Sequence, residues 1–153
     1  MAADVEVAKG WKSRFELMDR IKAGDPSWLG DREAIKGLAA GDLSRLHFNV
    51  LAFFFGPFYY FAKGMWAKGA LMWIAVILVA SLLILVESLP TAVFFVQYVP
   101  FAVYANYDYY HKVRRNEKFW PFLPPALASA PVVGILLVAA MATLMAVVLS
   151  TDP

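Results

Sequence analysis

A glycine–proline pair interrupts an aromatic stretch of this chain and limits how the chain can meet a membrane. The stretch runs from Leu46 to Ala62, and Gly56-Pro57 lies near its centre. A helix that spans a bilayer needs about 20 mostly apolar residues, so this stretch only just qualifies. Proline also removes a backbone donor and clashes with the preceding helical turn. We therefore expect residues 46–62 to form a re-entrant or interfacial segment rather than a spanning helix.

The composition places the chain among integral membrane proteins. Of its 153 residues, 61% are hydrophobic, whereas a soluble domain is closer to about half apolar. The excess lies in the last two-thirds of the chain, where three further segments read as transmembrane helices: 70–89, 91–110 and 126–150. We expect an all-α membrane protein in which residues 46–153 form the membrane domain.

Residues 1–45 are polar and form a separate segment. Trp11, Phe15 and Met18 follow helical spacing, which predicts an amphipathic helix over 5–23. A second short helix is expected over 31–40, with Asp31 as a possible cap. We interpret the segment as cytoplasmic helices that pack on the membrane domain. The alternative is a helix that lies on the lipid surface through Trp11 and Phe15.

The positions of the basic residues favour one topology. If 46–62 does not cross the bilayer, all fourteen Lys and Arg residues lie on the cytoplasmic side. If it does cross, either the basic residues of 1–45 or those of 63–118 must lie outside. Because basic residues near membrane ends stay in the cytoplasm, we expect a cytoplasmic N-terminus and an exported C-terminus.

One face of the helix expected over 91–110 is polar. Gln97, Tyr104, Asp108 and His111 lie at i, i+7, i+11 and i+14. Ionisable groups within a membrane are functional candidates, so Asp108 and His111 could relay a proton or bind a cation. The simpler interpretation places both near the cytoplasmic end, with their charges solvated or paired with a lysine: Lys63, Lys68 or Lys112.

A ladder of small residues follows the last expected helix at four-residue spacing, interrupted by Val138. Its members are Ala126, Ala130, Gly134, Ala142, Ala146 and Ser150. Small residues let helix backbones approach closely in lipid. The ladder is therefore either a docking face for another membrane protein or a second copy, or a surface that packs on the other helices of this chain.

No pattern in the sequence indicates catalysis. The chain has no Cys, no phosphate-binding loop, no His-Glu-x-x-His pair and no Gly-x-Ser-x-Gly elbow. A net charge of +2 is too small to indicate a nucleic-acid partner. We expect no catalytic residue, no metal and no cofactor.

Two motifs together resemble a known family. They are RLHFNVLAFFFGPFYYFAKGMWAKGA (45–70) and ANYDYYHK (105–112). Their distinctive residues include Asn49, Gly56, Pro57, Gly64, Met65, Trp66, Asn106, Tyr107 and Tyr110. The resemblance, over roughly residues 11–118, is to small bacterial inner-membrane proteins grouped as domain-of-unknown-function family 2628. It implies a multi-pass location in that membrane and brings no catalytic residues. From the residues themselves, we expect a hydrogen bond between Asn49 and Asn106.

The function that we expect is non-enzymatic. Catalytic motifs are missing, whereas the small-residue ladder and the aromatic segment offer contact faces. We expect an accessory or interaction protein that assembles in the bilayer with a larger membrane complex or with itself. The alternative is a small transporter or channel component that works as an oligomer, with its path lined by the polar face of 91–110.

Overall fold

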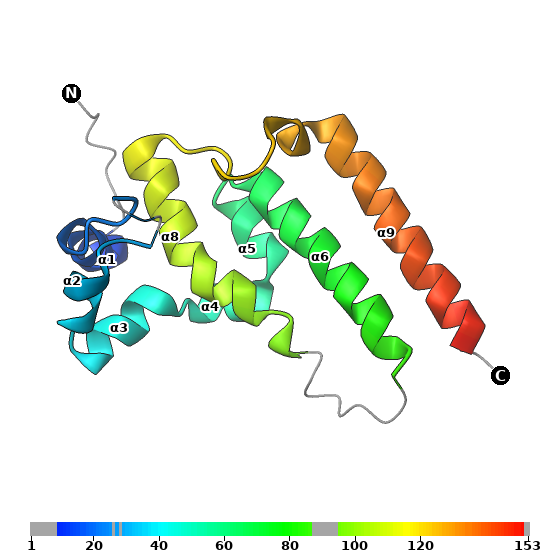
Figure 1. Cartoon of the computed structure of the whole chain (residues 1–153), viewed down its shortest axis with the longest axis horizontal. Coiled ribbons are helices and arrows are strands. Elements are labelled where there is room, and N and C mark those ends of the chain that lie inside the picture. The colour runs from blue at the N-terminus through cyan, green and yellow to red at the C-terminus, as the bar shows by residue number, and fades with distance from the viewer. Residues whose placement is uncertain (1–8, 26, 28, 87–94, 152–153) are drawn as a thin grey trace.

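The computed structural model describes residues 9–25, 27, 29–86 and 95–151 (Figure 1). Every regular element in this part of the chain is a helix, which confirms the all-α class. The elements are α1 (Lys9–Arg20), α2 (Arg32–Lys36), α3 (Ala40–His47), α4 (Val50–Phe55), α5 (Pro57–Ala62), α6 (Trp66–Ile84), α8 (Val99–Arg115), the 3-10 helix η1 (Pro125–Ala128) and α9 (Ala130–Thr151).

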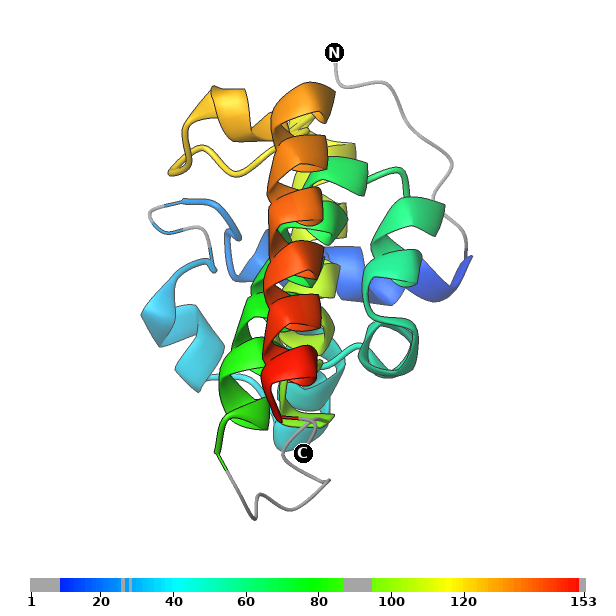
Figure 2. The ribbon, with the colours of Figure 1, turned by 90° about the vertical axis from the view of Figure 1, so that its right-hand side faces the viewer.

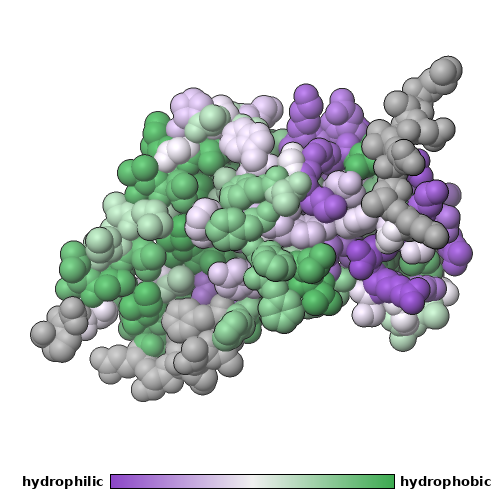
Figure 3. All heavy atoms as spheres, turned by 180° about the vertical axis from the view of Figure 1, so that it is seen from behind, coloured by the Kyte–Doolittle hydropathy of each residue, from purple (hydrophilic) through white to green (hydrophobic). Residues whose placement is uncertain are grey.

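The other helices pack around two central helices, α8 and α6. Helices α1, α3 and α4 contact α8, whereas α5 and α9 contact α6. Helices α6 and α9 run side by side in the same direction, and α8 runs the opposite way (Figure 1). Figure 2 looks onto α9, which forms one outer edge of the molecule. Apolar side chains gather over α6 and α9, and polar ones gather at the opposite end, around α1–α3 (Figure 3).

Two helices of the described residues are long and apolar enough to span a membrane. They are α6, with a mean hydropathy of 2.2, and α9, with 2.8. The expectation of three such helices is wrong, because 91–110 does not supply one. Helix α8 carries Asn106 and Asp108 inside the protein and ends in three basic residues. Residues 91–94, the first part of that expected span, and 87–89, the last part of the span expected over 70–89, lie outside the described residues.

The aromatic stretch is broken where the sequence predicts a break. Helix α4 ends at Phe55, Gly56 has φ +48° and ψ −123°, and α5 begins at Pro57. At the first position of a helix, proline loses no hydrogen bond. The stretch therefore forms two short helices in place of one long one, and its entry into a bilayer stays a prediction.

The N-terminal helix packs on the protein through its aromatic side. Trp11 and Phe15 are buried, and their ring centroids lie 4.6 Å and 5.3 Å from those of Tyr109 and Tyr110, respectively. These contacts agree with packing on the rest of the chain and take both rings away from a lipid surface. The side chain of Asp31 accepts a 2.9 Å hydrogen bond from the Glu33 amide and caps α2, as expected.

Two further boundaries differ from the expectation. Helix α6 begins about one turn earlier than residue 70, at Trp66, so Lys68 lies within the helix rather than in a polar link. The last helix begins at Ala130 instead of 126, because η1 and an extended Ser129 precede Pro131. Helix α3 was not foreseen and crosses the boundary expected at residue 45.

Candidate functional site

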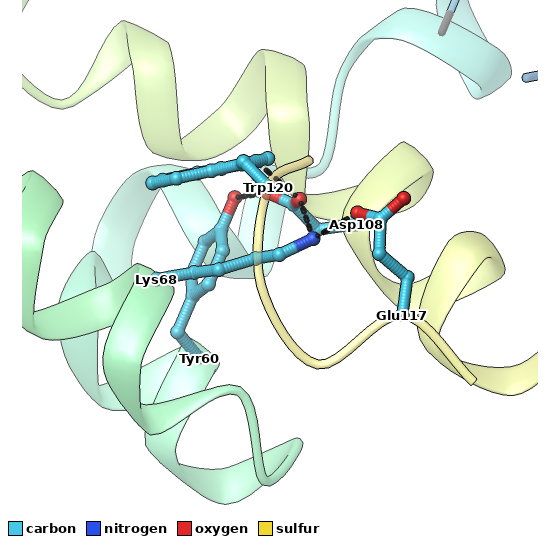
Figure 4. A network of polar contacts seen from close by, with 5 residues as sticks. All are labelled: Tyr60, Lys68, Asp108, Glu117 and Trp120. Atoms are coloured by element: carbon cyan, nitrogen blue, oxygen red, sulfur yellow. Dashed lines mark hydrogen bonds and ion pairs between the residues drawn. The ribbon is translucent and has the colours of Figure 1, made fainter. Parts of the chain in front are cut away.

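A buried ionic cluster joins three parts of the chain (Figure 4). Lys68 of α6 places its Nζ 2.7 Å from Oδ1 of Asp108 in α8, and 2.7 Å from Oε1 of Glu117 in the following loop. The Lys68 and Asp108 side chains are fully buried, and that of Glu117 is 16% exposed. A buried charge is very costly unless it is paired. The pairing therefore fixes how α6, α8 and the loop meet.

Two neutral donors complete the surroundings of the Asp108 carboxylate. The Tyr60 hydroxyl donates to Oδ2 at 2.9 Å, and Nε1 of Trp120 donates to Oδ1 at 2.8 Å. Hydrogen bonds to an ionised acceptor are stronger than neutral ones. Groups from α5, α6 and the loop therefore donate to both carboxylate oxygens and hold these elements against α8. We call this cluster the clamp; its members are Tyr60, Lys68, Asp108, Glu117 and Trp120.

The residues of the expected polar face lie in different surroundings. Asp108 pairs with Lys68, one of the three lysines that the sequence offers for this role. Gln97 lines an apolar cavity, and Tyr104 is 41% exposed. His111 is buried in the protein.

Three members of the clamp were missed by the sequence analysis: Tyr60, Glu117 and Trp120. Tyr60 lies 48 positions from Asp108, and Glu117 lies 49 positions from Lys68. No local spacing connects residues so far apart. Trp120 is only 12 positions from Asp108, but it follows the end of α8 and so falls outside any helical register.

The small-residue ladder faces outward. All six of its residues are exposed, whereas Val133 and Ala140 bury the other side of α9 against α6. A Cβ atom added at Gly134 would have no neighbouring atom within 4 Å. The ladder therefore does not pack on the described helices of its own chain, and its role in docking stays a prediction.

An amide pair ties the aromatic segment to α8, as expected from the sequence. Nδ2 of Asn49 donates to Oδ1 of Asn106 at 2.8 Å and to the Tyr59 hydroxyl at 3.0 Å. Oδ1 of Asn49 caps α4 by accepting from the Ala52 amide. Nδ2 of Asn106 donates to the carbonyls of residues 45 and 46 at the end of α3. Two side chains thus hold α3, α4, α5 and α8 together.

The other residues of the two motifs also have structural contacts. The Tyr107 hydroxyl lies 3.2 Å from Nδ1 of His47, and burial lowers the pKa of the His47 ring. The Tyr110 hydroxyl donates to Asp19 at 2.6 Å. Met65 is buried, Gly56 and Gly64 have positive φ, and Trp66 is 46% exposed. Most residues of these motifs therefore form contacts inside the fold and do not line an accessible binding site.

The chain matches the model of one protein family. The model of DUF2628, described as a protein of unknown function, matches residues 4–115. The chain belongs to the DUF2628 family. None of the curated proteins and none of the solved structures matches it. In this DUF2628 chain, no group of three or more His, Asp or Glu within the described residues could hold a metal ion.

The amide pair of this DUF2628 protein gives a direct test of the fold. Asn49→Ala and Asn106→Ala each leave buried polar groups without a partner, and each should lower the free energy of unfolding by about 1–3 kcal/mol. The double variant should lose less than the sum of the two, by about 0.5–3 kcal/mol. Denaturant unfolding in detergent, followed by circular dichroism, measures all four proteins. Fully additive losses would show that the two amides are not coupled.

Proposed function

We propose that this DUF2628 protein is a non-enzymatic accessory protein of a membrane, and that it assembles with a larger membrane complex or with a second copy of itself through α9. The observation that carries the proposal is the exposure of the five ladder residues that lie on α9, from Ala130 to Ser150. The helix contacts α6 and the short η1 along one side, which leaves the opposite side available to a partner helix.

The outer side of α9 combines small and large residues. Ala142 lies beside exposed Val138 and Met145, and the surface there is hollowed by a depression of about 650 Å³. Lipid tails are as apolar as leucine side chains, so helices in a bilayer associate through close packing rather than through a hydrophobic driving force. A ladder of small residues next to such a depression allows that close packing.

The location that we propose is the bacterial inner membrane, with the N-terminus in the cytoplasm and the C-terminus in the periplasm. Helices α6 and α9 supply two apolar spans of the same direction. Residues 46–62 would be re-entrant or interfacial, in keeping with the exposure of Leu51, Phe54 and Phe58 on α4 and α5. The basic residues then lie on the cytoplasmic side.

Helix α8 makes the return between the two spans in this arrangement. It is too polar to face lipid on all sides, but eight of its residues are buried in the protein. The buried pairing of Asp108 with Lys68 keeps the carboxylate of Asp108, the group of α8 that would be most unfavourable in lipid, away from the lipid. The clamp thus supports a multi-pass arrangement in which only two helices are apolar throughout.

Single-cysteine variants test both the location and the assembly, because the native chain has no thiol. We expect an impermeant maleimide to label Ser150→Cys in intact cells and Gly10→Cys only after permeabilisation. Both positions are exposed, whereas Lys68 is buried and unsuitable as a probe site. Labelling of Gly10→Cys in intact cells would overturn the orientation.

Cross-linking examines the proposed face of α9. We expect Ala142→Cys and Ala146→Cys to form cross-links to a partner in native membranes, visible as heavier bands on a gel. Thr143→Cys is the matched control, because it is also exposed but lies about 100° around the helix from residue 142. Cross-links of equal yield at 142 and 143, or none at 142 and 146, would contradict the proposal.

The alternative function, a component of a small transporter or channel, gains no support from the geometry. A path would have to join the polar face of α8, but Asp108 is closed in by Lys68, Tyr60 and Trp120. Tyr104, in contrast, is 41% exposed.

A further inference from the structure

A narrow cavity lies between α6 and the start of α8. Its volume is about 400 Å³, within the range of small-molecule sites. All but one of its lining residues are apolar: Met72, Ala75, Val76, Val79, Leu83, Val96, Gln97, Pro100 and Phe101. An apolar ligand is therefore favoured over a charged one.

The cavity extends along α6 for the depth of one lipid leaflet. On α6 it reaches from Met72 to Leu83, which is about 16 Å at about 1.5 Å per residue. The hydrocarbon core of a bilayer is about 30 Å thick, so one leaflet contributes about 15 Å. A second cavity of about 230 Å³ shares Met72 and Pro100 and continues the groove towards Trp120. The shape suits one extended hydrocarbon chain.

The single polar residue of the lining, Gln97, favours a ligand that carries a hydrogen-bond donor. Oε1 of Gln97 is buried and accepts no hydrogen bond from any of the described residues. A buried acceptor without a donor is unfavourable, so a ligand that brings an N–H or O–H group would be preferred. Gln97 lies just before α8, and Leu83 is next to the last residue of α6. The donor is therefore required at the end of the groove where α6 ends, which in the membrane location proposed above lies towards the lipid head groups.

We propose that this groove binds one acyl chain of a membrane lipid whose head group donates a hydrogen bond to Gln97. This inference rests on the membrane location proposed above. The shared chemistry is a donor on the head group, which an ethanolamine ammonium or a glycerol hydroxyl supplies. A choline head group has no N–H or O–H donor and serves as the negative arm.

Lipid exchange followed by native mass spectrometry tests the site on the full chain. The purified protein is incubated with phosphatidylethanolamine, phosphatidylglycerol or phosphatidylcholine of identical acyl chains. We expect one lipid per chain, with at least one donor-bearing lipid retained about tenfold more than phosphatidylcholine. The stronger of the first two arms identifies the donor. Equal retention of all three lipids would overturn the role of Gln97.

Two variants separate the head-group contact from the chain contact. Gln97→Met keeps the length of the side chain and should abolish the preference while one lipid remains bound. Ala75→Phe should fill the groove and lower lipid retention about tenfold. Ala139→Phe, on the exposed surface of α9 outside the groove, is the control and should leave retention unchanged. Retention by Ala75→Phe equal to that of the control would overturn the site.

The failure of this inference is distinguishable from that of the proposed location. A carbonate wash of native membranes releases peripheral proteins and leaves integral ones in place. If the chain stays in the membrane but binds no lipid after purification, the lipid site is wrong and the location stands. If the wash releases the chain, both proposals are wrong.

Discussion

Replacement of Lys68 by methionine is expected to lower the free energy of unfolding by about 3–5 kcal/mol. The variant keeps the length of the side chain but removes the only charge that pairs with Asp108 in the described structure. Asp108 is fully buried, so its charge would remain without compensation in the interior. Thermal and denaturant unfolding in detergent, followed by circular dichroism, gives the loss.

Two comparisons make this prediction specific. Lys118→Met removes an exposed lysine near the same loop and should change stability by no more than about 0.5 kcal/mol. The double variant Lys68→Met with Asp108→Leu removes both charges and should recover most of the loss, since apolar replacement of a buried pair is often close to neutral. A Lys68→Met variant as stable as Lys118→Met would refute the clamp.

Gly56→Ala should be the most damaging of the conservative changes in the aromatic segment. At φ +48° and ψ −123°, an L side chain is strained, which costs about 1–3 kcal/mol. The new Cβ would also lie 2.8 Å from Cε1 of Tyr98, so that ring must move. We expect lower thermal stability and a loss of contact between α4 and α8.

Gly134→Ala is the matched control for this second prediction. Gly134 lies within α9, where alanine favours the helix by about 1 kcal/mol over glycine and meets no neighbouring atom. Its melting temperature should therefore be unchanged or raised, while that of Gly56→Ala falls. Equal effects of the two substitutions would mean that Gly56 is not needed for the break.

The sequence was informative where structure depends on nearby residues. The break at Gly56-Pro57 and the cap at Asp31 follow from backbone chemistry over a few positions. The amide pair was also accessible, because Asn49 and Asn106 stand out as polar groups beside aromatic clusters. In each case the residue type restricts the possible conformation or the possible partner.

The sequence was less informative where burial decides the outcome. Lys68 looked like part of a basic link, but the earlier start of α6 places it on a helix that faces Asp108. The span expected over 91–110 was inferred from the excess of hydrophobic residues in the last two-thirds of the chain. Polar groups such as Asn106 and Asp108 are instead enclosed by the N-terminal helices, α5 and the 117–120 loop, which no local pattern indicates.

The shared direction of α6 and α9 bears on how such a protein is made. In the proposed orientation, nascent α8 must come back through the bilayer, yet among the described residues the counter-charge of Asp108 lies on α6. Insertion one helix at a time would leave that carboxylate in lipid. We therefore expect α6 and α8 to enter the membrane together as a paired hairpin, with α9 joining last. Replacement of Lys68 should then impair membrane integration before it affects the finished fold.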